Sequence, residues 1–208
     1  EVEIVPDPAY TNDDLFAVLT SVATDPDGDA ITYTYTWSVD GVFYTTGSST
    51  SIPASATAKG QEWCVTVEAS GGVESSGSDT DCLVVQNTPP SIDSVSIDPP
   101  DAGASDGLTC SYSGFYDLDG DPDESRYAWT VNGVYVGSGA TLDEGYSGGD
   151  TVTCTVTPND GEADGEPKSA TISIENGEPV LVGVTLSPDP AYTDDTMVCT
   201  PGSTTDPD

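Results

Sequence analysis

Two short stretches of the chain place carboxylates at alternate positions. Asp25, Asp27 and Asp29 lie in the segment 23–41, with a glycine between the last two. The segment 116–133 repeats and extends this pattern, with Asp117, Asp119, Asp121 and Asp123. Calcium prefers about six to eight oxygen ligands and accepts flexible loops. The spacing therefore makes calcium the candidate cofactor of both stretches.

Turn formation explains the same residues without a ligand, because Asp, Pro and Gly all favour turns. An EF-hand loop does not fit either stretch. Its sixth position requires glycine, but Ala30 stands there for a loop that begins at Asp25, and Pro122 for one that begins at Asp117. A calcium site would therefore need carboxylates that converge from several loops. Calcium-binding loops and solvated turns both remain open from the sequence.

The charge of the chain excludes several kinds of partner. Its 208 residues include 37 acidic and 3 basic side chains and no histidine, for a formal charge of −34. Nucleic-acid binding requires clustered cations, so it is excluded. Without histidine there is no His general base or Ser-His-Asp triad, and we expect no enzymatic activity. The charge itself is compatible with bound divalent cations or with a high-salt setting.

Internal repeats organise the chain. The motif VEIVPDPAYTNDD at 2–14 returns as VTLSPDPAYTDD at 184–195, and Trp37-Ser-Val-Asp-Gly returns as Trp129-Thr-Val-Asn-Gly. The Asn- and Pro-containing segments between repeats read as linkers. No apolar run approaches the ~20 residues of a membrane span, so we expect no membrane insertion in this segment. The predicted units are domain 1 at 1–87, a linker at 88–91, domain 2 at 92–176, a linker at 177–180 and the start of a truncated third domain at 181–208. We expect that both ends were cut from a longer tandem array.

Each repeat reads as a series of short strands. Between Ile31 and Val39 apolar and polar residues alternate, which is typical of a half-buried strand. Asp40-Gly41 and Asn132-Gly133 are strong signals for two-residue hairpin turns. About seven strands in a repeat of about 90 residues predict an all-β fold of tandem immunoglobulin-like β-sandwiches. We expect these domains to form an elongated array.

The cysteines fit this fold. Cys110 and Cys154 lie on either side of Trp129 in sequence, which is the order in which a disulfide joins two sheets against a buried tryptophan. Such a bond contributes about 3–4 kcal/mol by the loop-entropy estimate. Trp37 is the matching core residue of the first repeat.

The first repeat lacks that core pair, because Ala17 and Val65 align with Cys110 and Cys154. Instead, Cys64 and Cys82 align with outward-facing positions of the last two strands, which predicts a cross-strand surface disulfide. Cys199 aligns with Cys110, and we expect its partner to lie beyond residue 208. Free buried cysteines are the alternative. Disulfides indicate an oxidising, extracytoplasmic compartment.

The motifs DPDGDAITYTYTWSVDG, GDTVTCTVTPNDG, NTPPSIDSVSIDPP and the closing SIEN resemble the tandem immunoglobulin-like and PKD-like repeats of large bacterial and archaeal cell-surface proteins. The resemblance covers the whole chain at the level of the superfamily. It implies an extracellular, repetitive protein used for adhesion, stalks or surface structure.

The sandwich also provides a way for carboxylates to converge. The loop after the second strand and the last hairpin loop lie at the end where each domain begins. In the second repeat this end offers 117–123 together with Asp160, Glu162 and Asp164. We expect the preceding domain to add Asp13 and Asp14 near the linker. In the same way, we expect Asp206 and Asp208 of the third repeat to converge with Asp101 and Asp106 of the second. By analogy with cadherins, calcium would stiffen such joints, which would otherwise repel and flex.

These features predict a non-catalytic structural repeat of an extracellular stalk, fibre or filament. Its partners would be other repeats of the same chain, and it would self-associate into a fibre through shared cations or strand edges. The alternative is an adhesin or a carbohydrate-binding module, which would require unique exposed aromatic residues in one repeat. Trp63, Phe43 and Tyr44 are the candidates, although Trp63 is in phase with core positions.

Overall fold

The computed structural model describes residues 1–71 and 75–206 and divides them into two compact units. Unit 1 contains Glu1–Pro90, Tyr116–Pro122 and Asp160–Asp164, and unit 2 contains Ser91–Phe115, Asp123–Asn159 and Gly165–Asp208. Two loops that join strands of unit 2 therefore belong to unit 1. The sequence-based domain limits stay predictions beside this division. In the described residues, no helix is long and apolar enough to cross a membrane.

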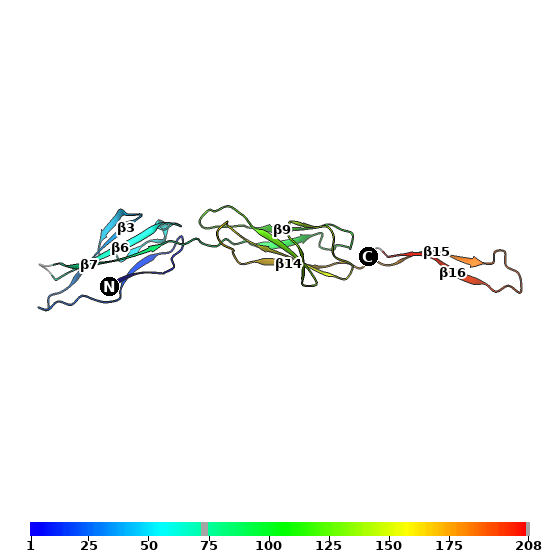
Figure 1. Cartoon of the computed structure of the whole chain (residues 1–208), viewed down its shortest axis with the longest axis horizontal. Coiled ribbons are helices and arrows are strands. Elements are labelled where there is room, and N and C mark those ends of the chain that lie inside the picture. Colours follow the sequence, from blue (N-terminus) through cyan, green and yellow to red (C-terminus); the bar gives the residue numbers. More distant parts are fainter. Residues whose placement is uncertain (72–74, 207–208) are drawn as a thin grey trace. The chain divides into compact units, whose positions relative to one another are not determined.

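Two antiparallel sheets form the sandwich of unit 1 (Figure 1). The three-stranded sheet has the order β1 (Val2–Val5), β2 (Leu15–Leu19) and β5 (Ser51–Ile52). The four-stranded sheet has the order β4 (Val42–Gly47), β3 (Thr32–Val39), β6 (Glu62–Ser70) and β7 (Ser75–Val84). A 3-10 turn at Ala54–Ala56 connects β5 to β6.

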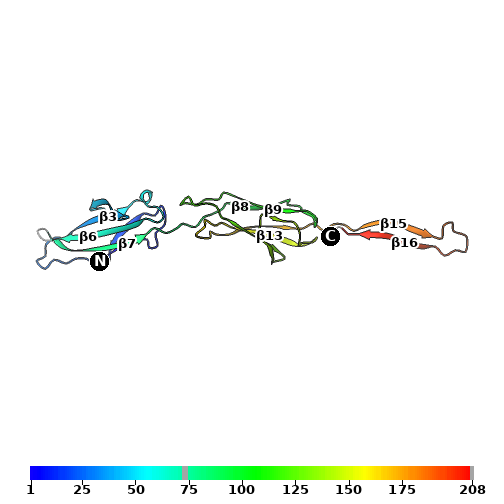
Figure 2. The ribbon, with the colours of Figure 1, turned by 45° about the horizontal axis from the view of Figure 1, so that its top comes forward.

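Unit 2 repeats this topology (Figure 2). Its three-stranded sheet has the order β12 (Thr141–Leu142), β9 (Leu108–Ser113) and β8 (Ser94–Asp98). Its four-stranded sheet has the order β11 (Val134–Gly137), β10 (Arg126–Val131), β13 (Thr151–Thr157) and β14 (Lys168–Ser173). The chain continues into a hairpin of β15 (Val180–Ser187) and β16 (Val198–Thr205). The predicted tandem immunoglobulin-like fold is confirmed.

Strand alternation places one tryptophan at the centre of each sandwich. Trp37 and Trp129 are both fully buried, at 0 % exposure. Trp63 is also in the core of unit 1, where its ring meets that of Tyr44 edge to face at 4.9 Å between centroids. Trp63 is therefore a packing residue, as its phase along the strand predicts.

The hairpin turns have the expected backbone. Asp40 and Gly41 have φ angles of 51° and 73°, and Asn132 and Gly133 have 49° and 80°. Two consecutive positive φ angles match the twist of the flanking strands, which is why Asp-Gly and Asn-Gly are selected at these positions. The same turn in both units brings β3 against β4 and β10 against β11.

Both predicted disulfides are present. Cys110 is bonded to Cys154 in the core of unit 2, and Cys64 is bonded to Cys82 across the neighbouring strands β6 and β7. Cys199 is exposed and free in the described part of the chain. Its pairing with a cysteine beyond residue 208 stays a prediction.

Reduction should open the two disulfides in a fixed order. Cys82 is exposed, whereas Cys110 and Cys154 are buried, and thiol–disulfide exchange requires access to a sulfur atom. Under native conditions, dithiothreitol should therefore release Cys64 and Cys82 well before Cys110 and Cys154. Timed alkylation followed by peptide mass spectrometry measures both reactions. Equal labelling rates for the two pairs would contradict the assigned burial.

Candidate metal centre

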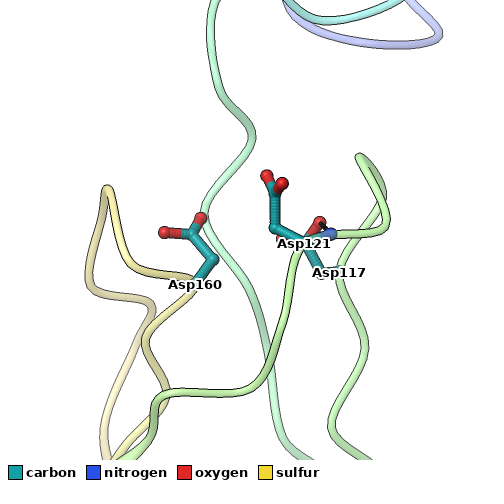
Figure 3. Close-up of side chains that lie close together, drawn as sticks. All are labelled: Asp117, Asp121 and Asp160. Atoms are coloured by element: carbon teal, nitrogen blue, oxygen red, sulfur yellow. Dashed lines mark hydrogen bonds between the residues drawn. The ribbon is translucent and has the colours of Figure 1, made fainter.

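Three carboxylates converge in unit 1. Oxygen atoms of Asp117, Asp121 and Asp160 all lie within 4.8 Å of one another, and no other group of three acidic, Cys or His residues in the described part of the chain does so. Figure 3 shows that Asp117 and Asp121 come from one loop and Asp160 from another. These are the β9–β10 and β13–β14 loops. Like charges at this distance repel strongly unless a cation or donors compensate them.

The β9–β10 loop is folded around one carboxylate oxygen. Asp117 Oδ1 accepts hydrogen bonds from the backbone N–H groups of Asp119 (2.9 Å) and Asp121 (3.0 Å). Gly120, between these two residues, has a φ angle of 82°, which side chains rarely allow. The turn therefore accounts for Asp117 Oδ1, whereas Asp117 Oδ2 is buried without a hydrogen-bond partner.

The β13–β14 loop holds Asp160 in a similar way. Asp160 is 3 % exposed, and its Oδ1 accepts hydrogen bonds from the N–H groups of Glu162 (2.7 Å) and Ala163 (2.6 Å). Its Oδ2 accepts a hydrogen bond from the side-chain amide of Asn87 (2.7 Å). Burial alone raises the pKa of this carboxyl, but the hydrogen bonds from Asn87, Ala163 and Glu162 outweigh burial and hold the pKa below its ordinary value. Asp160 is therefore ionised at neutral pH.

The linker segment contributes to the same centre. The backbone N–H of Thr88 donates to Asp119 Oδ2 at 2.6 Å, next to the Asn87 contact with Asp160. Within the described residues, four buried side-chain polar atoms lack a hydrogen-bond partner, and all four are oxygens of this cluster. They are Asn87 Oδ1, Thr88 Oγ1, Asp117 Oδ2 and Asp119 Oδ1. Each such group costs about 1–3 kcal/mol if it stays unpaired.

One cation reaches the edge of the centre. The ammonium of Lys59 donates to Asp121 Oδ2 and to Glu162 Oε1, each at 2.7 Å, so it bonds to both acidic loops. The hydrogen bond to Asp121 and then the one to Glu162 raise the pKa of Lys59 above its ordinary value. The side chain of Lys59 is 24 % exposed, so solvent screens this ion pair only in part.

The first acidic stretch has the same local geometry. Asp25 Oδ1 accepts the N–H groups of Asp27 (2.8 Å) and Asp29 (3.2 Å), and Gly28 has a φ angle of 84°. These carboxylates do not form a group of three with other acidic residues in residues 1–71 and 75–206. The β6–β7 loop at 72–74, which corresponds to the loop of Asp160, lies outside the described residues.

Several other predicted ligands do not join the cluster. Asp123 Oδ2 accepts the Tyr112 hydroxyl at 2.7 Å and its Oδ1 accepts Ser125, and these bonds lower the pKa of Asp123 although burial opposes them. Asp206 follows β16 as an exposed residue, and Asp208 lies outside the described residues. Asp106 and Asp101 belong to unit 2 and are not part of the three-carboxylate group.

The first turn of unit 1 is likewise used for local capping. Asp13 Oδ2 accepts the N–H of Tyr10 at 2.8 Å, and Asp14 Oδ1 accepts the N–H of Ala54 at 2.6 Å. The structure does not bring either carboxylate into the cluster. Instead, Asn87 and Lys59, which were not among the predicted ligands, bond to Asp160 and Asp121. Two features of the sequence could have indicated these residues. Asn87 directly precedes the linker, and Lys59 is one of only three basic side chains in a chain of charge −34.

Comparisons with known proteins give no family for this chain. No family model matches the sequence. No curated protein matches it. Solved structures with a similar fold include tandem fibronectin type III segments.

A two-domain fibronectin type III segment of chicken tenascin has 16% identity and a TM-score of 0.45 and covers 83% of this chain and 97% of its own. The FN1–FN3 domains of chicken CNTN1 have 12% identity, a TM-score of 0.34 and coverages of 80% and 63%. The fibronectin(III)-like modules of Clostridium thermocellum CbhA have 14% identity, a TM-score of 0.29 and coverages of 84% and 94%.

The two sandwiches define the class of protein. Each joins a three-stranded and a four-stranded antiparallel sheet around a buried tryptophan, which is an immunoglobulin-like β-sandwich. The chain contains two such sandwiches in tandem. Since one such fold hosts many functions, the acidic centre is the place from which a function must be argued.

The pKa of Asp160 should depend on Asn87. It lies below that of the unfolded chain, about 3.9, so ionised Asp160 stabilises the fold above about pH 4. This contribution is lost as the pH falls through the folded-state pKa. In Asn87→Ala, the pKa should rise, as carboxyl-carbon NMR titration without calcium would measure. Asn176→Ala is the matched control, because the Asn176 amide donates to Gly177 O instead. An unchanged pKa in Asn87→Ala would contradict the assigned hydrogen bond.

Proposed function

We propose that the chain is a non-catalytic structural repeat of an extracellular surface stalk, fibre or filament, and that its acidic centre binds calcium. The observation that carries this proposal is the set of buried oxygen atoms without donors around Asp117, Asp121 and Asp160. Carboxylate and amide oxygens that no N–H reaches are suited to a cation.

The chemistry of these atoms favours calcium over other metals. Asp117 Oδ2, Asp119 Oδ1 and Asn87 Oδ1 are hard oxygen donors, and Asp121 and Asp160 add carboxylates. Zinc and copper sites use histidine or cysteine, but the chain has no histidine. Magnesium requires a small, nearly ideal octahedron, whereas calcium accepts the irregular geometry that two loops and a linker provide.

Calcium at this centre would have a mechanical role. The β9–β10 and β13–β14 loops begin and end in strands of unit 2, whereas their carboxylates lie with the linker residues Asn87 and Thr88 in unit 1. A cation shared by the two loops and the linker would hold these segments of unit 1 together. Without the cation, repulsion among the carboxylates would loosen the same contacts.

The disulfides favour an extracellular setting for this role. Two bonded pairs, one in each unit, indicate an oxidising compartment, since thiols are kept reduced in most cytosols. Extracellular calcium is abundant enough for sites with dissociation constants of about 10⁻⁴–10⁻³ M. An extracellular location and calcium binding are therefore consistent with each other.

Exposed aromatic residues favour a scaffold over a carbohydrate-binding module. A binding site would make one repeat different from the other. Instead, Phe43 (64 % exposed) on β4 and Tyr135 (62 % exposed) on β11 occupy corresponding edge strands. Trp63, the strongest sequence candidate for sugar stacking, is 1 % exposed. Surfaces that recur from repeat to repeat are expected of a structural array.

These edge strands provide a route to self-association. The β4 and β11 strands have the sequences VFYTTG and VYVG, which contain no charge and no proline. The edge at β1 differs, because acidic side chains cover it. Asp79 and Asp81 accept hydrogen bonds from the N–H groups of Val2 and Ile4. Uncovered, neutral edges are the places where a second copy of so acidic a chain meets the least repulsion. We propose edge-to-edge pairing of copies as the fibre contact.

Calcium should stabilise the chain through Asp117. Free calcium at about 100 times the dissociation constant adds about 2.7 kcal/mol to the free energy of unfolding. Asp117→Asn keeps the Oδ1 that accepts the two loop N–H groups but replaces the unpartnered Oδ2, so it should abolish most of this gain. Thermal unfolding in EGTA and in millimolar calcium measures the effect. Asp25→Asn, which changes the same loop position in the first repeat, should respond like the wild type.

No calcium-dependent stabilisation of the wild type would reduce the acidic stretches to solvated turns. An equal loss in Asp117→Asn and Asp25→Asn would show that the cluster is not the site.

Charges on the edge strands should prevent self-association. In Phe43→Lys/Tyr135→Lys, the lysines leave the buried core unchanged but place a solvated charge on each edge, which opposes strand pairing between copies. Sedimentation velocity at rising concentration in calcium should show oligomers for the wild type and monomers for the double variant. Val22→Lys, at an exposed position outside the strands, is the control. A wild type that stays monomeric at all concentrations would contradict edge pairing.

A further inference from the structure

Lys59 is placed against the acidic centre by a turn that does not itself require lysine. The turn is fixed by the backbone: the N–H of Lys59 donates to Thr11 Oγ1 at 2.8 Å, and the N–H of Gly60 donates to Val85 O at 2.9 Å. In the second repeat, Gly149 makes the matching bond to Ile174 O at 2.9 Å. The residue that corresponds to Lys59 is then Gly148. The fold accepts a residue without any side chain at this position.

The Lys59 ammonium satisfies only the outer part of the centre. It donates to Asp121 Oδ2 and Glu162 Oε1. The four buried oxygens of Asn87, Thr88, Asp117 and Asp119 stay without a partner in its presence. The Lys59 ammonium therefore neutralises only part of the negative charge of the cluster. The remaining charge and the unpartnered oxygens are available to a second cation. The chain has two other cationic side chains, Arg126 and Lys168, and both lie in unit 2.

We propose that Lys59 is a tethered competitor of calcium, which sets the calcium concentration at which the centre fills. This inference rests on the proposed function, because it assigns the regulation of the same site. Lys59 holds one carboxylate oxygen, on Asp121, that a bound ion would share or take over. Its positive charge also repels the ion across the cluster.

The competition has opposite consequences in the two states of the site. Without calcium, Lys59 offsets the repulsion among Asp121, Asp160 and Glu162 and keeps the two loops together. With calcium, the same charge weakens binding, so the site fills only at the higher concentrations found outside cells. A purely structural ion pair would stabilise both states alike. This difference makes the proposal testable.

The test compares calcium affinity and calcium-free stability in the full chain. Lys59→Met keeps the aliphatic stem and the backbone bond to Thr11 but removes the charge. Calorimetric titration with calcium chloride should show a dissociation constant about tenfold lower than that of the wild type, the order expected for removing one nearby charge. The melting temperature in EGTA should fall, and the rise caused by calcium should increase.

Two controls separate charge from packing. Lys59→Arg retains the positive charge and should behave like the wild type. Lys168→Met removes a charge whose ammonium donates to the backbone carbonyl of Asp93, and it should leave calcium affinity unchanged.

The outcomes distinguish this inference from the proposed function. A wild type that does not bind calcium, together with a Lys59→Met variant that also does not, would overturn the calcium centre itself. A wild type that binds calcium with the same affinity as Lys59→Met would leave the centre intact and overturn the competition. Weaker binding in Lys59→Met would show that Lys59 supports the site and would also overturn it.

Discussion

Electrostatic repulsion among densely packed carboxylates is the main physical constraint on the acidic centre of unit 1. In the described part of the chain, oxygens of Asp117, Asp121 and Asp160 lie within 4.8 Å of one another. Four buried oxygens have no hydrogen-bond partner, one on Asp117 and the others on Asn87, Thr88 and Asp119. Backbone N–H groups compensate one oxygen each of Asp117 and Asp160, and Lys59 compensates Asp121. We propose that a cation bound by the remaining oxygens would give the two loops and the linker a common function.

The architecture of the sandwich makes that convergence possible. Hydrophobic burial around Trp37 and Trp129 fixes two sheets in each unit, and the loops are free to carry polar residues. The β9–β10 and β13–β14 loops belong to unit 1, although the strands that they join belong to unit 2. We propose that calcium removal would release repulsion among these carboxylates and leave the packing of the cores intact.

Local sequence patterns were enough to predict the fold, including its hairpin turns and its disulfide pairs. Strand alternation, the Asp40-Gly41 turn and the order Cys110, Trp129, Cys154 each have a short-range physical meaning, and the structure confirms all three. The site was harder to predict, because carboxylates at the first turn can also cap the backbone. Asp13 does so for Tyr10, and the hydrogen bond of Asn87 to Asp160 spans 73 positions in sequence. No local pattern contains that information.

Diffraction would show whether the acidic centre holds the calcium ion that we propose for it. Crystals of the full chain grown with calcium chloride should show one anomalous peak about 2.3–2.6 Å from Asp117 Oδ2 and from oxygens of Asp119, Asp121, Asp160 or Asn87. Lys59 should have a weaker contact with Asp121 in that crystal. A centre filled by ordered water, with the Lys59 contact unchanged and no anomalous signal in saturating calcium, would contradict the account.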